Sequence, residues 1–121
     1  MKVTLPWPPK ELSPNYRGHW AAVYKRQKQY KEDCWILCKQ ARMAKPPGDR
    51  IEVTMRFYPP TNRNRDQDNL VASMKYGLDA LAAAMGVDDK LFDIKIEVSP
   101  ELGGKVEITV AGWESSNPLG S

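Results

Sequence analysis

The sequence has few of the residues that most metal and thiol sites use. It contains one histidine, His19, and two cysteines, Cys34 and Cys38, in 121 residues. The cysteines lie four residues apart in a helical pattern, where a disulfide is rare and a zinc site would lack companion ligands. We therefore expect two buried, reduced thiols and no zinc.

Long apolar runs are also absent. No segment approaches the roughly 20 apolar residues that span a membrane, and the first ten residues, MKVTLPWPPK, lack the apolar centre of a secretory signal. We expect a cytoplasmic protein, in a bacterium or a phage-infected cell, with no membrane partner. A hydrophobic content of 41% suffices for one modest core, so we expect a single domain over residues 1–112 and a flexible tail over 113–121.

Charge is unevenly distributed along the chain. Residues 1–50 carry 11 Lys/Arg against 4 Asp/Glu, a net +7, and residues 51–121 carry 7 against 11, a net −4. This polarity suits a protein with a basic surface for a polyanion and an acidic cluster for another purpose. A solvated basic helix explains the charge alone equally well.

Hydrophobic periodicity divides the chain into strands and helices. Alternating apolar residues predict four strands, at residues 2–7, 51–58, 92–98 and 106–110. Helical spacing predicts helices at residues 20–43 and 67–85, the second ended by Gly86. A hairpin turn from Pro100 to Gly104 is expected to join the last two strands. The order β-α-β-α-β-β predicts an α+β fold, a four-stranded mixed sheet with two helices packed on one face.

Two aspartates open the second predicted helix. Asp66 occupies its N-cap position and Asp68 its first turn, where free backbone N–H groups and the helix dipole favour a carboxylate. This structural role explains either aspartate well. It explains less well why both occur, together with Asp88 and Asp89 in the loop beyond the other end of the same helix.

An Asp-x-Asp pair at a strand-to-helix junction also suits a magnesium ion, which prefers hard oxygen ligands. Such an ion polarises a phosphodiester and lowers the pKa of an attacking water. Arg63 and Arg65, directly before the pair, could hold the phosphate and stabilise developing charge. By itself, Asp-x-Asp is a weak signal.

The wider pattern is more specific. The pieces are LPWPP at residues 5–9, S-x-N-x-R at 13–17, R-x-R-D-x-D-N-L at 63–70, L-D-A-L at 78–81 and Asp-Asp at 88–89. This set resembles the RusA family of Holliday junction resolvases, small endonucleases often carried by phages and prophages, over about residues 3–110. The resemblance implies a homodimeric crossover junction endodeoxyribonuclease that binds four-way junction DNA and makes paired symmetric nicks in recombination and repair. It also implies Mg²⁺ as cofactor, with Mn²⁺ as a substitute, and no organic cofactor.

The resemblance assigns roles to individual residues. The catalytic, metal-binding carboxylates fall on Asp66, Asp68 and Asp89, with Asp88 as a further metal ligand, and the catalytic lysine falls on Lys75. This lysine stands seven residues after Asp68 instead of four, so its backbone starts about 10 Å along the helix instead of about 6 Å. A surface pair between Lys75 and Asp79, four residues on, is the structural alternative.

The resemblance also favours DNA contact for six basic residues and one asparagine, namely Arg63, Arg65, Arg17, Lys25, Arg26, Lys28 and Asn15. Aromatic residues interleave with this set and could stack on unpaired bases. Alternatively, Trp20 and Tyr30 belong to the core. Trp7 and Trp35 lie on apolar stripes, and we expect both in the core.

The predicted second helix poses a geometric problem. A single helix over residues 67–85 is roughly 27 Å long and separates Asp68 from Asp89. Either the helix breaks, for instance at Gly77, or two subunits each contribute one acidic pair to a composite site. Two other functions stay open: a dimeric DNA-binding protein that does not cut, with the aspartates as helix caps, and a nuclease for other branched DNA.

Overall fold

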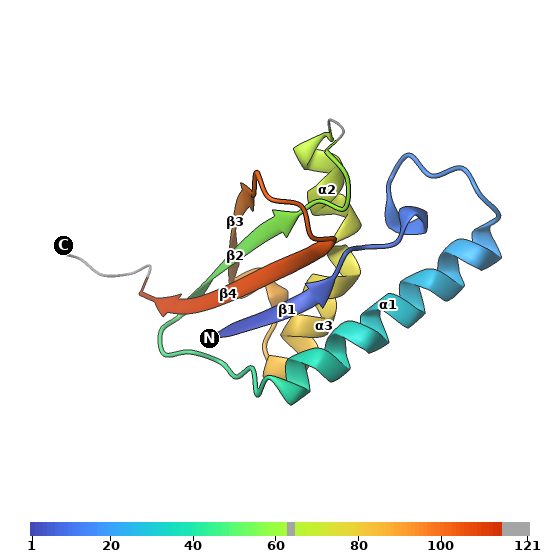
Figure 1. Cartoon of the computed structure of the whole chain (residues 1–121). Coiled ribbons are helices and arrows are strands. Elements are labelled where there is room, and N and C mark those ends of the chain that lie inside the picture. The colour runs from blue at the N-terminus through green and yellow to red at the C-terminus, as the bar shows by residue number, and fades with distance from the viewer. Residues whose placement is uncertain (63–64, 115–121) are drawn as a thin grey trace.

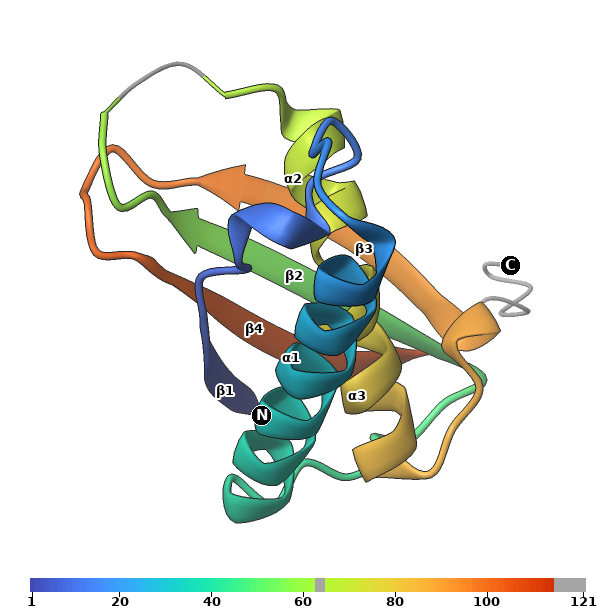
Figure 2. The same ribbon diagram turned by 90° about the vertical axis from the view of Figure 1, so that its right-hand side faces the viewer.

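The computed structural model describes residues 1–62 and 65–114. In this part of the chain, three α-helices cover one face of a four-stranded sheet (Figure 1; Figure 2). The elements are β1 (Lys2–Pro6), the 3₁₀ turn η1 (Lys10–Leu12), α1 (Trp20–Gln40), β2 (Arg50–Tyr58), α2 (Gln67–Ser73), α3 (Lys75–Met85), the 3₁₀ turn η2 (Asp89–Leu91), β3 (Phe92–Val98) and β4 (Lys105–Trp113). The α+β class and the four-stranded mixed sheet are confirmed. The two-helix arrangement is not, because the second predicted helix is divided.

The sheet order is β1-β4-β2-β3. β4 runs antiparallel to β1 and β2, and β3 runs parallel to β2. The predicted hairpin is therefore wrong, since β2 lies between the last two strands. Their connection crosses the end of β2, where the Ser99 N–H donates to the Phe57 carbonyl at 2.8 Å and the Gly104 N–H donates to the Tyr58 carbonyl at 2.7 Å.

The core lies between the sheet and the helices. Side chains at alternate positions of β2 are fully buried, and the residues between them are only half-buried, as a period of two requires. The buried set consists of Ile51, Val53, Met55 and Phe57. This strand sits in the middle of the sheet, so its apolar face is covered along its whole length.

Cys34 and Cys38 are free and buried on the inner face of α1, as predicted. Burial raises the pKa of the Cys34 thiol to about 12 and that of Cys38 to about 11. Both thiols are therefore protonated near neutral pH and have little nucleophilic or metal-binding capacity. Their contribution is to packing.

The predicted second helix is broken at Met74 (φ −92°, ψ 3°), which ends α2 and precedes α3. Gly77, the position named as an example of such a break, is instead buried within α3. A Cβ at Gly77 would lie 2.9 Å from Met74 Cε and 3.4 Å from Tyr30 Cε2. A Cβ here would require the end of the Met74 side chain to move, so glycine allows α3 to pack closely on its neighbours. Gly86, in the left-handed conformation at φ 72°, ends α3 as predicted.

Tyr30 joins three elements. Its side chain is 3% exposed, and its hydroxyl donates to the Pro6 carbonyl at 2.7 Å and lies 3.4 Å from Met74 Sδ. Burial raises the pKa of Tyr30, so the hydroxyl stays a donor. The end of β1, the middle of α1 and the helix break are thus held together by one side chain.

We expect Tyr30→Phe to lower the free energy of unfolding by about 1–2 kcal/mol, because a part-buried carbonyl loses its partner. Urea denaturation monitored by circular dichroism measures the change. Tyr24→Phe is the matched control, because Tyr24 is 61% exposed on the same helix. Equal stabilities of the two variants would contradict this role.

The division of the other large aromatic residues between core and surface differs from the prediction. Trp35 is 43% exposed, so its assignment to the core is wrong. Trp20 is 75% exposed, whereas Tyr30 is in the core. Trp7 is half-buried, with its ring edge-on to Phe57 at a centroid distance of 5.8 Å.

At the C-terminal end, β4 reaches Trp113, the first residue of the predicted tail. The Trp113 indole N–H donates to Asp93 Oδ2 at 3.0 Å. Residues 115–121 of that tail lie outside the described residues. Within the described ranges, none of the helices has the length and apolar character to cross a membrane.

Candidate active site

Asp66 and Asp68 stand at the start of α2, and both are exposed. Asp66 Oδ1 accepts a hydrogen bond from the Asp68 N–H at 2.8 Å, which is the geometry of a helix N-cap. The Asp68 carboxylate makes no hydrogen bond or ion pair within residues 1–62 and 65–114. The helix-cap interpretation therefore accounts for one oxygen of Asp66. Asp68 stands in the first turn of α2, where the helix dipole favours its carboxylate but no hydrogen bond from the described residues holds it.

The later acidic pair repeats this arrangement. Asp88 Oδ1 accepts from the Lys90 N–H at 2.9 Å and so caps η2. Asp89 is exposed, and its carboxylate has no partner in the described part of the chain. One member of each pair therefore caps a helical turn. The carboxylate of the other member has no hydrogen bond or ion pair among the described residues and could bind a metal ion. This difference favours Asp89 over Asp88 as the candidate ligand.

The two acidic pairs lie at opposite ends of the consecutive helices α2 and α3 (Figure 2). No group of three or more Asp, Glu, His or Cys residues that could hold a metal ion is found among the described residues. The break at Met74 thus does not bring Asp89 to Asp66 and Asp68 within one chain. The exposed carboxylate oxygens are nevertheless the ligand type that Mg²⁺ prefers.

Arg65 is held in a fixed orientation next to Asp66. Its Nη1 donates to the Thr61 carbonyl at 2.7 Å and its Nη2 to Thr61 Oγ1 at 2.8 Å. The guanidinium carbon also lies 5.4 Å from the centroid of the Trp7 ring. Arg63, the other predicted phosphate-binding arginine, lies outside the described residues.

Lys75 opens α3. Its Nζ lies 3.4 Å from Asp79 Oδ2 and 5.2 Å from the centroid of the Tyr76 ring. The structure thus contains the surface pair that was the alternative to a catalytic role. Such an exposed pair is worth only about 0.2–0.5 kcal/mol, so a phosphate could displace it. The catalytic role of Lys75 stays a prediction.

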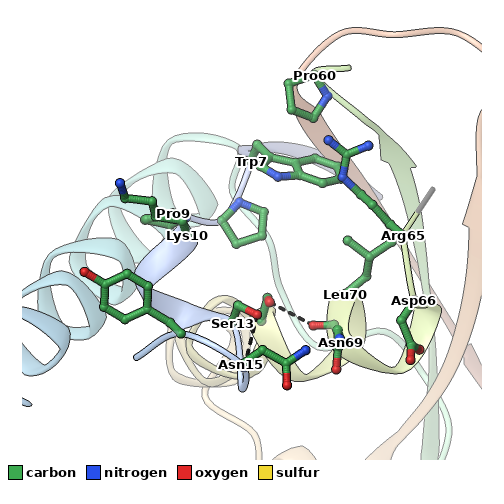
Figure 3. Close-up of a pocket in the computed structure, with 13 residues that line it drawn as sticks. Trp7, Pro9, Lys10, Ser13, Asn15, Pro60, Arg65, Asp66, Asn69 and Leu70 are labelled. Atoms are coloured by element: carbon green, nitrogen blue, oxygen red, sulfur yellow. Dashed lines mark hydrogen bonds between the residues drawn. The ribbon is translucent and has the colours of Figure 1, made fainter. Parts of the chain in front are cut away.

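A pocket of about 570 Å³ adjoins Asp66 (Figure 3). Its lining comes from the segment after β1 and from the start of α2, together with Pro60 and Arg65. Its lining includes three predicted site residues, Asn15, Arg65 and Asp66. It also includes residues to which no part in DNA or metal binding was assigned, among them Trp7, Pro9 and Asn69. All three belong to the LPWPP and D-N-L segments. These segments were noted as part of the family pattern, but the sequence alone did not indicate that they line a pocket.

The predicted DNA-binding residues of the first helix do not share one face. Lys25 and Lys28 are exposed and are neighbours at an i,i+3 spacing. Arg26 turns toward η1, where its Nε lies 3.8 Å from Glu11 Oε1. Arg17 is exposed just before α1. The N-terminal end of α1 therefore has an exposed cationic surface formed by Arg17, Lys25 and Lys28. Arg26 is directed to Glu11, at the side of this surface.

The arrangement suits a nuclease, because exposed acidic oxygens beside a fixed guanidinium and a basic helix match a phosphodiester substrate. The comparisons with known proteins agree. The sequence model of the endodeoxyribonuclease RusA family matches residues 6–111. The chain therefore belongs to the RusA family, whose membership indicates an endonuclease that resolves Holliday junctions.

One relative is a protein of Xylella fastidiosa (strain Temecula1 / ATCC 700964), named only as an uncharacterized protein. The two sequences are 36% identical over 115 residues, which cover 91% of this chain and 75% of the relative. The similarity therefore extends over nearly the whole chain.

Proposed function

We propose that the protein is an Mg²⁺-dependent endonuclease that resolves four-way DNA junctions by paired symmetric nicks and acts as a homodimer. The main support is a pair of exposed carboxylates, Asp68 and Asp89, in a member of the RusA family. Neither carboxylate has a hydrogen bond or ion pair among the described residues. A carboxylate that only capped a helix would be occupied by backbone N–H groups, as Asp66 and Asp88 are.

Each candidate residue has a distinct part in this proposal. Asp68, Asp89 and the second oxygen of Asp66 would hold the ion, which when bound polarises the phosphodiester and lowers the pKa of a water. Arg65, already oriented by Thr61, binds a phosphate oxygen beside Asp66. Lys75 exchanges Asp79 for a phosphate oxygen and compensates negative charge as it develops.

Phosphates farther from the cut are assigned to the cationic surface before and along α1. Arg17, Lys25 and Lys28 are exposed there, and Arg26 and Arg63 extend the set. These contacts are independent of sequence and should weaken as salt concentration rises.

The separation of the acidic pairs supports a composite site in a dimer. β2 and β3 run parallel, so Asp89, before β3, lies at the sheet end opposite to the one from which β2 leads toward Asp66. β3 is an edge strand, and Ile94 and Val98 on it are 38% and 41% exposed. Antiparallel pairing of two β3 edges about a two-fold axis would bring the partner subunit's Asp89 toward the end that carries Asp66.

A cleavage panel tests the proposal. Labelled four-way junction, linear duplex and flap DNA are incubated with Mg²⁺, with Mn²⁺ and with EDTA. We expect nicks in the junction alone, only with metal, at equivalent positions in two opposite strands. A supercoiled plasmid with an extruded cruciform should become linear without accumulating nicked circles if the two nicks are paired.

The capping bond of Asp66 keeps one alternative open, a DNA-binding protein that does not cut. Junction binding without nicks under either metal would establish this alternative. Equal cleavage of all three substrates would remove the selectivity for junctions.

A further inference from the structure

The pocket beside Asp66 has two walls of different chemistry (Figure 3). The rings of Trp7 and Pro9 stand on one side, and Asn15 and Asn69 stand on the other. Asn15 is bonded through its backbone N–H to Ser13 Oγ at 3.3 Å, and Asn69 through its backbone carbonyl to Ser73 Oγ at 2.8 Å. In the part of the chain described, their side-chain amides form no hydrogen bond. Each amide therefore offers a donor and an acceptor.

Three charged side chains line this pocket, Lys10, Arg65 and Asp66. Figure 3 shows Lys10 directed away from the space between the Trp7 ring and the two asparagines. Arg65 is bonded to Thr61 and lies over the Trp7 ring, and the proposed function assigns it to the phosphate beside Asp66 and not to a group inside the pocket. Asp66, a carboxylate, would repel an anion inside the pocket. The polar groups opposite the Trp7 and Pro9 rings are neutral amides. A flat, neutral ligand with donors and acceptors on its edge fits this combination better than a phosphate does.

We propose that the pocket receives one unstacked base of the cleaved strand, and that Asn15 and Asn69 set the base preference of cutting. This inference rests on the proposed function, because it places the adjoining phosphate at Asp66 and Asp68. The pocket volume of about 570 Å³ falls within the usual range for sites that enclose a small organic group.

The chemistry of a junction provides such a base. Stacking is interrupted where strands exchange, so a base there is displaced more easily than one inside a duplex. The rings of Trp7 and Pro9 replace part of the lost stacking, and the asparagine amides pair with the edge of the base. Only a base whose edge matches both amides would hold its phosphate at the carboxylates.

The first test measures base unstacking without cutting. Junctions carrying 2-aminopurine at single positions near the crossover are bound to the protein in EDTA, and fluorescence is recorded. We expect a rise at one position on the cut strand. The absence of a rise at any position would overturn the inference.

The second test measures base preference. Junctions with each of the four bases at that position are cut by the wild-type protein, and we expect rates that differ on the order of ten-fold between the best and the worst base. Asn15→Ala and Asn69→Ala should bring this ratio toward one. Both variants remove an amide without a folding role, whereas Trp7→Ala would also disturb the contact with Phe57. Gln67→Ala, an exposed amide on the same turn outside the pocket, should keep the ratio.

The results separate the two proposals. Junction nicking with a base ratio that both asparagine variants leave unchanged overturns the pocket inference and leaves the endonuclease standing. A position-specific fluorescence rise that is lost in the asparagine variants, in a protein that nicks nothing under either metal, supports the pocket and overturns the proposed nuclease activity.

Discussion

Replacing Asp68 with asparagine is expected to abolish junction nicking and to leave junction binding intact or tighter. The structure gives Asp68 no partner among the described residues, so the change breaks no bond that stabilises the fold. In the proposed function, it does remove a negative charge that faces the DNA backbone. Loss of one such group from a reacting centre lowers the rate by about 10²-fold or more.

The measurement is single-turnover cleavage of a labelled junction in Mg²⁺, with binding measured in parallel by gel shift in EDTA. Asp33→Asn is the matched control, because it makes the same change at an exposed carboxylate of α1 that accepts a bond from Gln29 Nε2 at 2.9 Å. Undiminished nicking by Asp68→Asn would remove this carboxylate from the mechanism. Loss of binding together with nicking would assign it to DNA recognition or folding.

The sequence predicted which face of each strand is buried more reliably than it predicted the neighbours of the strands. Alternation placed Ile51 to Phe57 in the core because it records one strand's two faces. The position of β4 between β1 and β2 depends on contacts between residues far apart in the chain. The expectation of a hairpin failed for this reason: two successive alternating segments need not pair.

The second helix shows a similar limit. Apolar spacing continues through Met74, so periodicity gave no sign of the break. Gly77 was a reasonable candidate, since glycine weakens a helix. Its surroundings are Tyr30 and the end of the Met74 side chain, which would have to move to admit a Cβ. Local propensity could not reveal a close contact with a helix packed against it.

For the candidate site, motif resemblance indicated the acidic residues, and the structure adds which of them are already engaged. Asp66 and Asp88 cap helical turns, whereas Asp68 and Asp89 do not. The pocket was missed because its walls come from residues separated by more than fifty positions, such as Pro9 and Asn69. Neither residue type has a chemical signature that points to a base-binding site when read alone.

The separation of the acidic pairs leads to the second large expected effect, which concerns heterodimers. Two tagged chains, one with Asp68→Asn and one with Asp89→Asn, are co-expressed and purified as a heterodimer. In a composite arrangement, one site combines both substitutions and the other has none. We therefore expect about half of the wild-type nicking rate, with single nicks, so that a cruciform plasmid becomes a nicked circle and not a linear molecule.

The matched control places both substitutions in one chain and pairs it with the wild-type chain. This heterodimer has the same composition, but in a composite arrangement each of its sites carries one substitution, so it should be inactive. Sites contained within single chains predict the reverse: the control nicks, and the first heterodimer does not. Because only the distribution of the substitutions differs, the comparison is insensitive to their effects on folding and on overall charge. An active control beside an inactive test heterodimer would require Asp68 and Asp89 of one chain to meet, and the described fold would then have to rearrange around α2 and α3.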